Sequence, residues 1–312
     1  MESKPLQRGP VIVGVALLCT LLWGTAYPAV KIGYELFAID TSAGQLLFAG
    51  LRFTLAGLMT LAVSVALQKR LVIPQRGQWK GITLLGLVQT TGQYIFFYLG
   101  LANTTGVNGS ILYAMATFFV VIFAHFLFPD DKMSVQKIAG CVIGFAGVLL
   151  ITMDGSGIGG GFAWNGEGFI ILSTLSSALG SIISRRVSQG QDPVVVTGYQ
   201  LTLGGLVLIL MGALGHGAFG VVTGKGVALL IYMAFLSAAA FTGWTMLLKY
   251  NPASRIAVYN FLIPVFGAGC SVLFLGESLF NVRSLLALVL ACAGIYIVNK
   301  EFTGAKKTVV SE

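Results

Sequence analysis

Side chains that can form hydrogen bonds and stacking contacts recur inside long apolar stretches of this sequence. Gln89, Gln93 and Phe97 follow one another at four-residue spacing, which places them on one face of a helix, and Tyr94 and Tyr98 lie beside them. Amides inside a bilayer need hydrogen-bond partners, so they usually face an interior or a cavity. The two glutamines and the two tyrosines are therefore predicted to bind a substrate.

Other polar and aromatic residues occupy comparable depths in other apolar stretches, where a shared central cavity would collect them. The further candidates for substrate binding are Trp23, Tyr27, Tyr113, Thr117, Ser177, Trp244, Tyr259 and Asn260. Walls of this kind suit small amphipathic molecules through stacking and hydrogen bonding. Serines and threonines also join helices as packing contacts, and Tyr98 and Trp244 fit an aromatic belt at the membrane interface equally well.

Arg52 is the remaining candidate for substrate binding. It lies about eight residues into its apolar stretch, roughly 12 Å along a helix axis. A buried guanidinium needs a carbonyl, a carboxylate or a substrate group as its partner. Two roles are open for Arg52, a contact with the substrate and a structural part in closing an outer gate.

The sequence shows no motif whose residue types and spacing would indicate a catalytic group or a metal site. The cysteines Cys19, Cys141, Cys270 and Cys292 lie in apolar stretches without metal-ligand spacing, and no H-E-x-x-H motif occurs. Gly155 to Gly160 fits G-x-G-x-x-G, but it follows a membrane stretch rather than a strand and is read as a loop. No catalytic residue, metal ligand or cofactor is predicted.

Ten apolar stretches must position these side chains. Of the 312 residues 56% are hydrophobic and only 10% are charged, and the mean hydropathy is +0.88, which indicates an integral membrane protein. Strand-like alternation is absent, so the stretches are predicted to be helices. They cover about residues 11–34, 44–67, 79–100, 106–128, 134–153, 166–186, 194–214, 226–248, 254–276 and 281–299.

The basic residues predict the orientation of these helices. With the N-terminus in the cytoplasm, 15 of the 19 lysines and arginines fall on the inner side. The positive-inside rule then places both termini in the cytoplasm. The net charge of +8 serves topology and contact with anionic lipid headgroups, so no nucleic-acid partner is predicted.

The second half of the chain repeats the first. Residues 113–133 align with residues 259–279 at an offset of 146 positions, so that Tyr113 meets Tyr259 and Asp131 meets Glu277. A repeat with an odd number of spans must be inserted upside down relative to its copy, and inverted repeats are typical of secondary transporters. The predicted units are residues 1–153, residues 154–300 and a cytoplasmic tail, 301–312.

Several segments resemble one known family, the EamA-type exporters of the drug/metabolite transporter superfamily. The similar segments are Leu21–Gly33, Leu51–Phe53, Ile182–Val187 and Phe274–Ser278. The resemblance implies a ten-helix exporter and says nothing about the substrate. One departure concerns the fourth helix, where Phe118 stands opposite the family-like proline of the second repeat, Pro264.

A carboxylate at the centre of the membrane is missing. None of the eleven acidic residues falls near mid-membrane. Small multidrug relatives in the superfamily carry such a carboxylate in the first helix, where this sequence has Trp23. The substrate is therefore predicted to be neutral, zwitterionic or anionic. A proton-coupled multidrug exporter is kept as an alternative, and a lipid-handling membrane enzyme as one from a different class.

The sequence thus predicts a secondary transporter of small metabolites, amino acids or similar amphipathic solutes, in a membrane of the bacterial inner-membrane type. Its two halves would rock around a central site, and Pro28 and Pro264 would weaken helices where bending helps. Export is implied by the resemblance alone. The expected partners are the solute and the lipid bilayer, and the expected state is a monomer or weak dimer.

Overall fold

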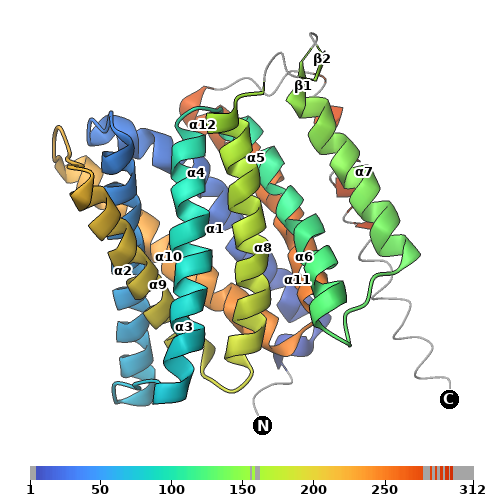
Figure 1. The fold of residues 1–312 in the computed structure, drawn as a ribbon, viewed down its shortest axis with the longest axis horizontal. Helices are drawn as coiled ribbons and strands as arrows, with labels where there is room; N and C mark the ends of the chain where they lie inside the picture. Colours follow the sequence, from blue (N-terminus) through green and yellow to red (C-terminus); the bar gives the residue numbers. More distant parts are fainter. Residues whose placement is uncertain are drawn as a thin grey trace.

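The computed structural model describes residues 5–154, 157–158 and 162–276, with scattered positions between 282 and 297. These residues form helices that pack together in one bundle, some upright and others oblique in the view of Figure 1. The exception is a two-residue antiparallel pair, β1 (Met153–Asp154) and β2 (Gly157–Ile158). Within the described residues, seven helices are long and apolar enough to cross a membrane.

The first half of the chain is built as the apolar stretches predict. Its helices are η1 (Pro5–Gln7), α1 (Gly9–Leu36), α2 (Ser42–Gln68), η2 (Arg76–Gln78), α3 (Trp79–Leu85), η3 (Gly86–Gly92), α4 (Gln93–Leu101), α5 (Gly106–Tyr113), α6 (Met115–Leu127) and α7 (Val135–Thr152). The third stretch, α3 to α4, is not among the seven long apolar helices, because the glutamines and threonines at its centre lower its hydropathy.

The second half follows the same scheme. Its helices are η4 (Trp164–Gly168), α8 (Phe169–Ser188), α9 (Pro193–Leu214), α10 (Gly224–Tyr250), α11 (Ala253–Ala257), η5 (Val258–Phe261) and α12 (Leu262–Leu275). Each of the first nine predicted stretches therefore coincides with helix. The tenth, 281–299, lies largely outside the described residues, as does the tail from 301 onward.

Capping side chains mark where several helices begin. Thr41, Thr105 and Thr223 accept hydrogen bonds from backbone N–H groups at the starts of α2, α5 and α10, at 3.0–3.1 Å. Asp192 does the same for α9 at 2.8 Å. Such caps satisfy N–H groups that have no partner within the helix, and each contributes about 1 kcal/mol.

The helices α2 and α9 cross at glycines. A Cβ atom at Gly205 would lie 2.5 Å from the backbone nitrogen of Thr54, and one at Gly50 would lie 2.5 Å from that of Ile209. Only glycine permits this approach, which resembles the small-residue contacts of membrane helices. The fifth and tenth predicted stretches also meet at small residues, since a Cβ at Gly294 would lie 2.5 Å from the carbonyl oxygen of Gly140.

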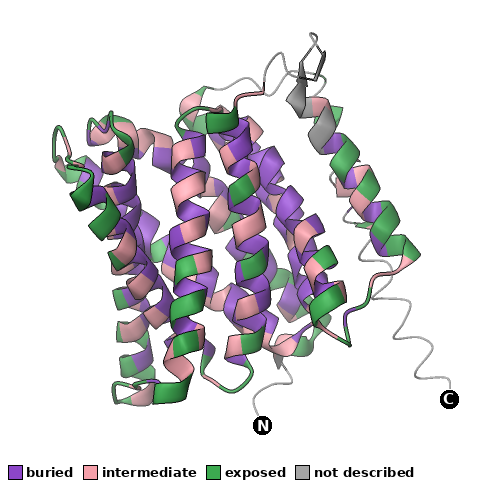
Figure 2. Ribbon diagram, in the orientation of Figure 1, coloured by how far each residue is buried: buried purple, intermediate pink, exposed green. Residues whose placement is uncertain are grey.

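Large apolar side chains cover the outside of the bundle. Leu58, Phe126, Leu210 and Phe235 are each more than half exposed, and buried residues face the interior (Figure 2). A water-soluble protein rarely exposes so much contiguous apolar surface. Together with the spanning helices, this surface identifies a multi-pass membrane protein.

Two of the spanning segments are broken near their middle. The fourth breaks at Ala114, where N–H groups bond three residues back rather than four, and the ninth breaks at the 3-10 turn η5. Pro264 follows that turn and lacks the N–H that would bond to residue 260. The fourth segment breaks at the corresponding place although it has Phe118 in place of the proline.

Candidate binding site

A small cavity lies in the interior of the bundle. Its volume is about 20 Å³, and a second cavity of about 10 Å³ lies beside it and shares Trp23, Gln93 and Tyr113 with it. A cavity needs about 10–15 Å³ of this kind of volume to hold one water molecule. At these volumes the two cavities have room for water but not for a metabolite.

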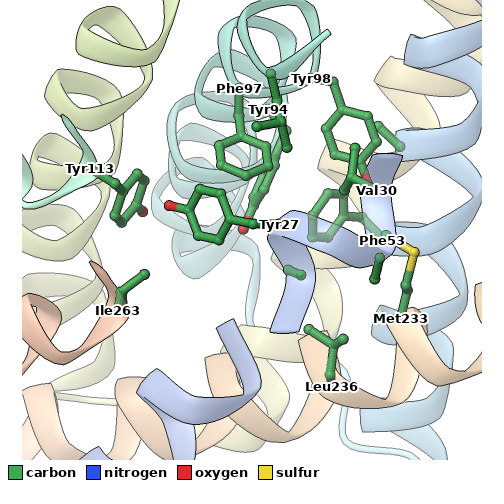
Figure 3. Close-up of a cluster of buried hydrophobic side chains, with 14 of the residues drawn as sticks. Tyr27, Val30, Phe53, Tyr94, Phe97, Tyr98, Tyr113, Met233, Leu236 and Ile263 are labelled. Carbon is green, nitrogen blue, oxygen red and sulfur yellow. The ribbon is translucent and has the colours of Figure 1, made fainter. Parts of the chain in front are cut away.

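Aromatic rings form most of the wall. Trp23 on α1 meets Trp244 on α10 edge to face, at 5.0 Å between ring centroids, and Tyr27 meets Phe97 on α4 in the same way at 5.4 Å. Figure 3 shows the hydroxyl end of Tyr27 directed toward Tyr113. Edge-to-face contacts of this kind fix the rings in place. The wall is thus preorganised for the apolar part of a solute.

The predicted glutamines lie in this wall. The Nε2 of Gln93 donates to the hydroxyl of Tyr113 at 2.9 Å, and that hydroxyl lies 2.7 Å from the Oγ of Ser177. The Oε1 atoms of Gln93 and Gln89 are buried and have no hydrogen-bond partner. A Cβ at Gly180 would lie 2.6 Å from the Cβ of Gln89, so α8 needs a glycine there to pack against the glutamine.

Arg52 reaches the same cavity from α2 and is fully buried. Its Nε donates to the Oγ of Ser237 at 2.9 Å and to the carbonyl of Met233 at 3.3 Å, and its Nη1 donates to the hydroxyl of Tyr98 at 3.1 Å. Its Nη2 has no partner. The helices α4 and α10 thus hold the guanidinium while one end of it stays available.

The structure brings ten of the thirteen predicted residues to the two cavities. They are Trp23, Tyr27, Arg52, Gln89, Gln93, Tyr94, Tyr113, Ser177, Trp244 and Asn260. Tyr98 supports Arg52 from behind, Thr117 joins α6 to α11 through the carbonyl of Ala257 at 2.9 Å, and Tyr259 packs against a neighbouring apolar cluster. Tyr98 and Trp244 are buried at 0% and 3% exposure, so the reading of them as interfacial belt residues is wrong.

Some residues of the wall were not among the predicted ones. Phe97 lies on the helix face that Gln89 and Gln93 define, and Ser181 continues the four-residue spacing of Ser177, so this spacing is a signal for both residues, although neither was included among the predicted binding residues. Ala26, Phe241 and Ile263 also line the cavities. As apolar residues in apolar helices, these three carry no sequence signal that separates them from lipid-facing or core positions.

A larger hollow opens at one end of the helices. It measures about 340 Å³ and is lined by Lys31, Tyr34, Glu35, Leu101, Ala102 and Leu275, and we call it the vestibule. The hydroxyl of Tyr34 donates to the carbonyl of Tyr98 at 2.9 Å. The side chain of Tyr98 binds Arg52, so these two tyrosines separate the vestibule from the cavity.

At the opposite end of the helices lie four charged residues and a serine, which we call the charged cluster: Asp130, Asp131, Lys137, Arg185 and Ser254. Asp131 lies 3.0 Å from the Nζ of Lys137 and accepts the N–H of Ser254 at 3.0 Å and its hydroxyl in a short bond. Arg185 binds Asp130 at 2.6 Å and stacks over Phe128. The cluster joins the α6–α7 connection to α8 and α11.

No metal centre accompanies these sites in the described part of the chain, where no group of three or more His, Cys, Asp or Glu side chains could hold an ion. The walls of the two cavities contain amides, hydroxyls, aromatic rings and one guanidinium. This set can bind and orient a small solute, and it offers no nucleophile paired with a base.

Comparisons with known proteins point to one family of transporters. The sequence profile of the EamA-like transporter family matches residues 11–153 and 164–300. A chloroplastic WAT1-related protein of Arabidopsis thaliana is 29% identical over 89% of this chain, which spans 66% of that longer protein. An uncharacterized transporter of Bacillus subtilis, YvbV, is 28% identical over 99% of this chain and 97% of its own length.

A probable amino-acid metabolite efflux pump of Salmonella typhimurium is 26% identical over 91% of this chain and 93% of its own. A solved crystal structure superposes with a TM-score of 0.70 at 20% identity, over 93% of this chain and 96% of the other. At that identity the likeness is one of fold.

Proposed function

Because the chain belongs to the EamA-like transporter family, we propose that this membrane transporter is a carrier of small amphipathic metabolites, such as amino acids, that works by alternating access. It is a transporter and not an enzyme. One observation carries the proposal: a small polar and aromatic cavity lies between a vestibule at one end of the helices and the charged cluster at the other. A carrier exposes one site to either side in turn.

Helix contacts support two inverted five-helix repeats. The first helix, α1, packs on α12 and α10, while its proposed counterpart α8 packs on α6 and α4. Likewise α2 packs on α10, and α9 packs on η3. If each helix is replaced by its counterpart in the other half, the contacts of α1 become those of α8, and the contact of α2 becomes that of α9. The break at Ala114 lies 146 residues before Asn260 in η5, and the family profile matches the chain in two separate segments.

The proposed carrier therefore has ten transmembrane helices, in repeats 1–153 and 154–300, with both termini in the cytoplasm of the cell. The charged cluster then forms the cytoplasmic gate, because it ties the first-half Asp131 and Lys137 to the second-half Arg185 and Ser254. The vestibule faces outward. The name of the Salmonella relative supports amino acids as solutes and export as the direction. A monomer or weak dimer would suffice, since the site lies within one chain.

The alternatives have less support. Proton-coupled export of cationic drugs would call for a carboxylate in the cavity, and none of its lining residues is acidic. A lipid-handling enzyme would need a catalytic group, and the lining offers no nucleophile with a base.

Counterflow in proteoliposomes tests the proposal. Vesicles containing the purified protein and loaded with an unlabelled mixture of the twenty amino acids should take up the same labelled mixture transiently above its equilibrium level. Only a carrier couples the two fluxes in this way. Uptake equal to that of protein-free vesicles would contradict the proposal, and proton-driven uptake of ethidium instead would favour the drug exporter.

A further inference from the structure

Arg52 carries a buried charge that the protein leaves without an opposite charge. The ion pairs among the described residues lie in the charged cluster, and none includes Arg52. Its hydrogen-bond partners are a hydroxyl, a backbone carbonyl and a phenol, and its guanidinium also lies over the rings of Phe53 and Tyr94. All of these contacts are neutral. A buried cation without a counterion is strongly disfavoured, so membrane proteins keep one mainly where it acts on an ion or a substrate.

Arg52 lines the cavity and keeps one end of its guanidinium unpaired. Nε and Nη1 have partners, whereas the two N–H groups of Nη2 have none. Arg52 lines the cavity together with Tyr27, Gln93 and Tyr94. Hydrogen bonds from guanidinium to carboxylate are among the strongest in proteins, and a carboxylate would also supply the missing negative charge. A neutral acceptor such as water would supply only the hydrogen bond.

Unpaired acceptors belong to residues of the two adjoining cavities, since Gln93 lines both of them and Gln89 lines the second. The Oε1 of Gln93 has no partner because the amide is held through its Nε2 by Tyr113, and the Oε1 of Gln89 is likewise unpaired. Buried carbonyl oxygens of this kind bind N–H groups. Aromatic faces at Trp23 and Tyr27 also attract a cation.

We infer that the site recognises solutes that carry a carboxylate and an amino group together, and that Arg52 determines this specificity by binding the carboxylate. The amino group is held by the glutamine carbonyls and the aromatic faces, and the remainder of the solute packs on the rings. This inference rests on the proposed carrier function. A solute without the carboxylate leaves Nη2 unpaired and the buried charge uncompensated, so it binds more weakly.

Competition in the counterflow assay tests the inference on the unmodified protein. The unlabelled competitor is either the mixture of twenty amino acids or the mixture of their amides, at equal total concentration. These α-amides keep the amino group and the side chain but lose the α-carboxylate. A lost hydrogen bond between charged groups corresponds to at least about tenfold in affinity, so the amides should compete at least tenfold more weakly. Equal competition would overturn the inference while leaving the carrier function in place.

Variants of Arg52 test whether the preference for amino acids over their amides depends on this side chain. In Arg52→Met the preference for acids over amides should disappear, and in Arg52→Lys part of it should remain because the charge is kept. Arg70→Met removes an exposed arginine just beyond α2 and should leave the preference unchanged. A folded Arg52→Met protein with the original preference would overturn the assignment. If that variant does not fold, the competition on the unmodified protein decides, and absence of any counterflow there would overturn the proposed function itself.

Discussion

Replacing Asp131 by asparagine removes the negative charge at the centre of the charged cluster while keeping the shape of the side chain. Asp131 is 2% exposed and joins Lys137 to Ser254. Its amide substitute can still accept from Ser254, but it no longer offsets the charge of Lys137. The closed form of the proposed cytoplasmic gate should therefore lose stability relative to a form in which this end is open.

The magnitude follows from the burial of the pair. Removing one partner of a buried ion pair costs about 3–5 kcal/mol. Taking about 3 kcal/mol, the ratio of open to closed protein rises by roughly 100-fold, since about 1.4 kcal/mol corresponds to tenfold. A carrier whose open form is populated at about 1% would then hold about half of its molecules open.

Distances between spin labels measure this population directly. Labels at the exposed positions Gln136 on α7 and Arg186 on α8 report on the two sides of the cluster. The unmodified protein should give one main distance, and Asp131→Asn should add a longer one of comparable weight. Asp130→Asn is the matched control, because the Asp130 side chain is 59% exposed and such pairs contribute little. A distance distribution in Asp131→Asn identical to that of Asp130→Asn would refute the gate.

Three further substitutions test the site and the packing. Gln93→Leu should lower counterflow at least about tenfold by removing both polar atoms from the cavity wall, whereas Gln189→Leu at an exposed position should not; equal fluxes in the two variants would count against the site. Tyr98→Phe should lower the free energy of unfolding by about 1–3 kcal/mol, seen as a lower melting temperature, because it leaves a guanidinium N–H buried and unpaired. Gly205→Ala should destabilise by about 1–3 kcal/mol where α9 meets α2, while Gly269→Ala, which has open space around it, should not; a reversed order of melting temperatures would contradict the close helix crossing.

The sequence predicted the elements and much of the site because the bilayer constrains both. Apolar stretches of membrane length become helices, and costly polar side chains inside them gather in one interior, as Gln93 and Ser177 do. Thr117 followed the same pattern and yet serves as a helix-to-helix contact, because a threonine hydroxyl can equally satisfy a neighbouring carbonyl. Composition does not distinguish these two uses.

Contacts between distant segments could not be predicted from the sequence. The charged cluster brings Asp131 and Ser254 together across more than a hundred residues, and nothing in their spacing indicates it. The partners of Arg52 on α4 and α10 also depend on how helices pack. The break in the fourth segment was equally hidden, because its Phe118 lacks the proline signal that marks the ninth.

A single cysteine at Gln93 tests alternating access most directly, in protein with the four native cysteines replaced. Gln93→Cys is treated with a membrane-impermeant thiol reagent added to one side of sealed vesicles or to the other. If the central site opens to each side in turn, the cysteine should react with reagent added on the vestibule side in the otherwise unmodified protein. Once Asp131→Asn opens the charged cluster, the cysteine should react with reagent added on the opposite side. Reaction from both sides at equal rates in both proteins, or from neither, would contradict a carrier with its site at this cavity.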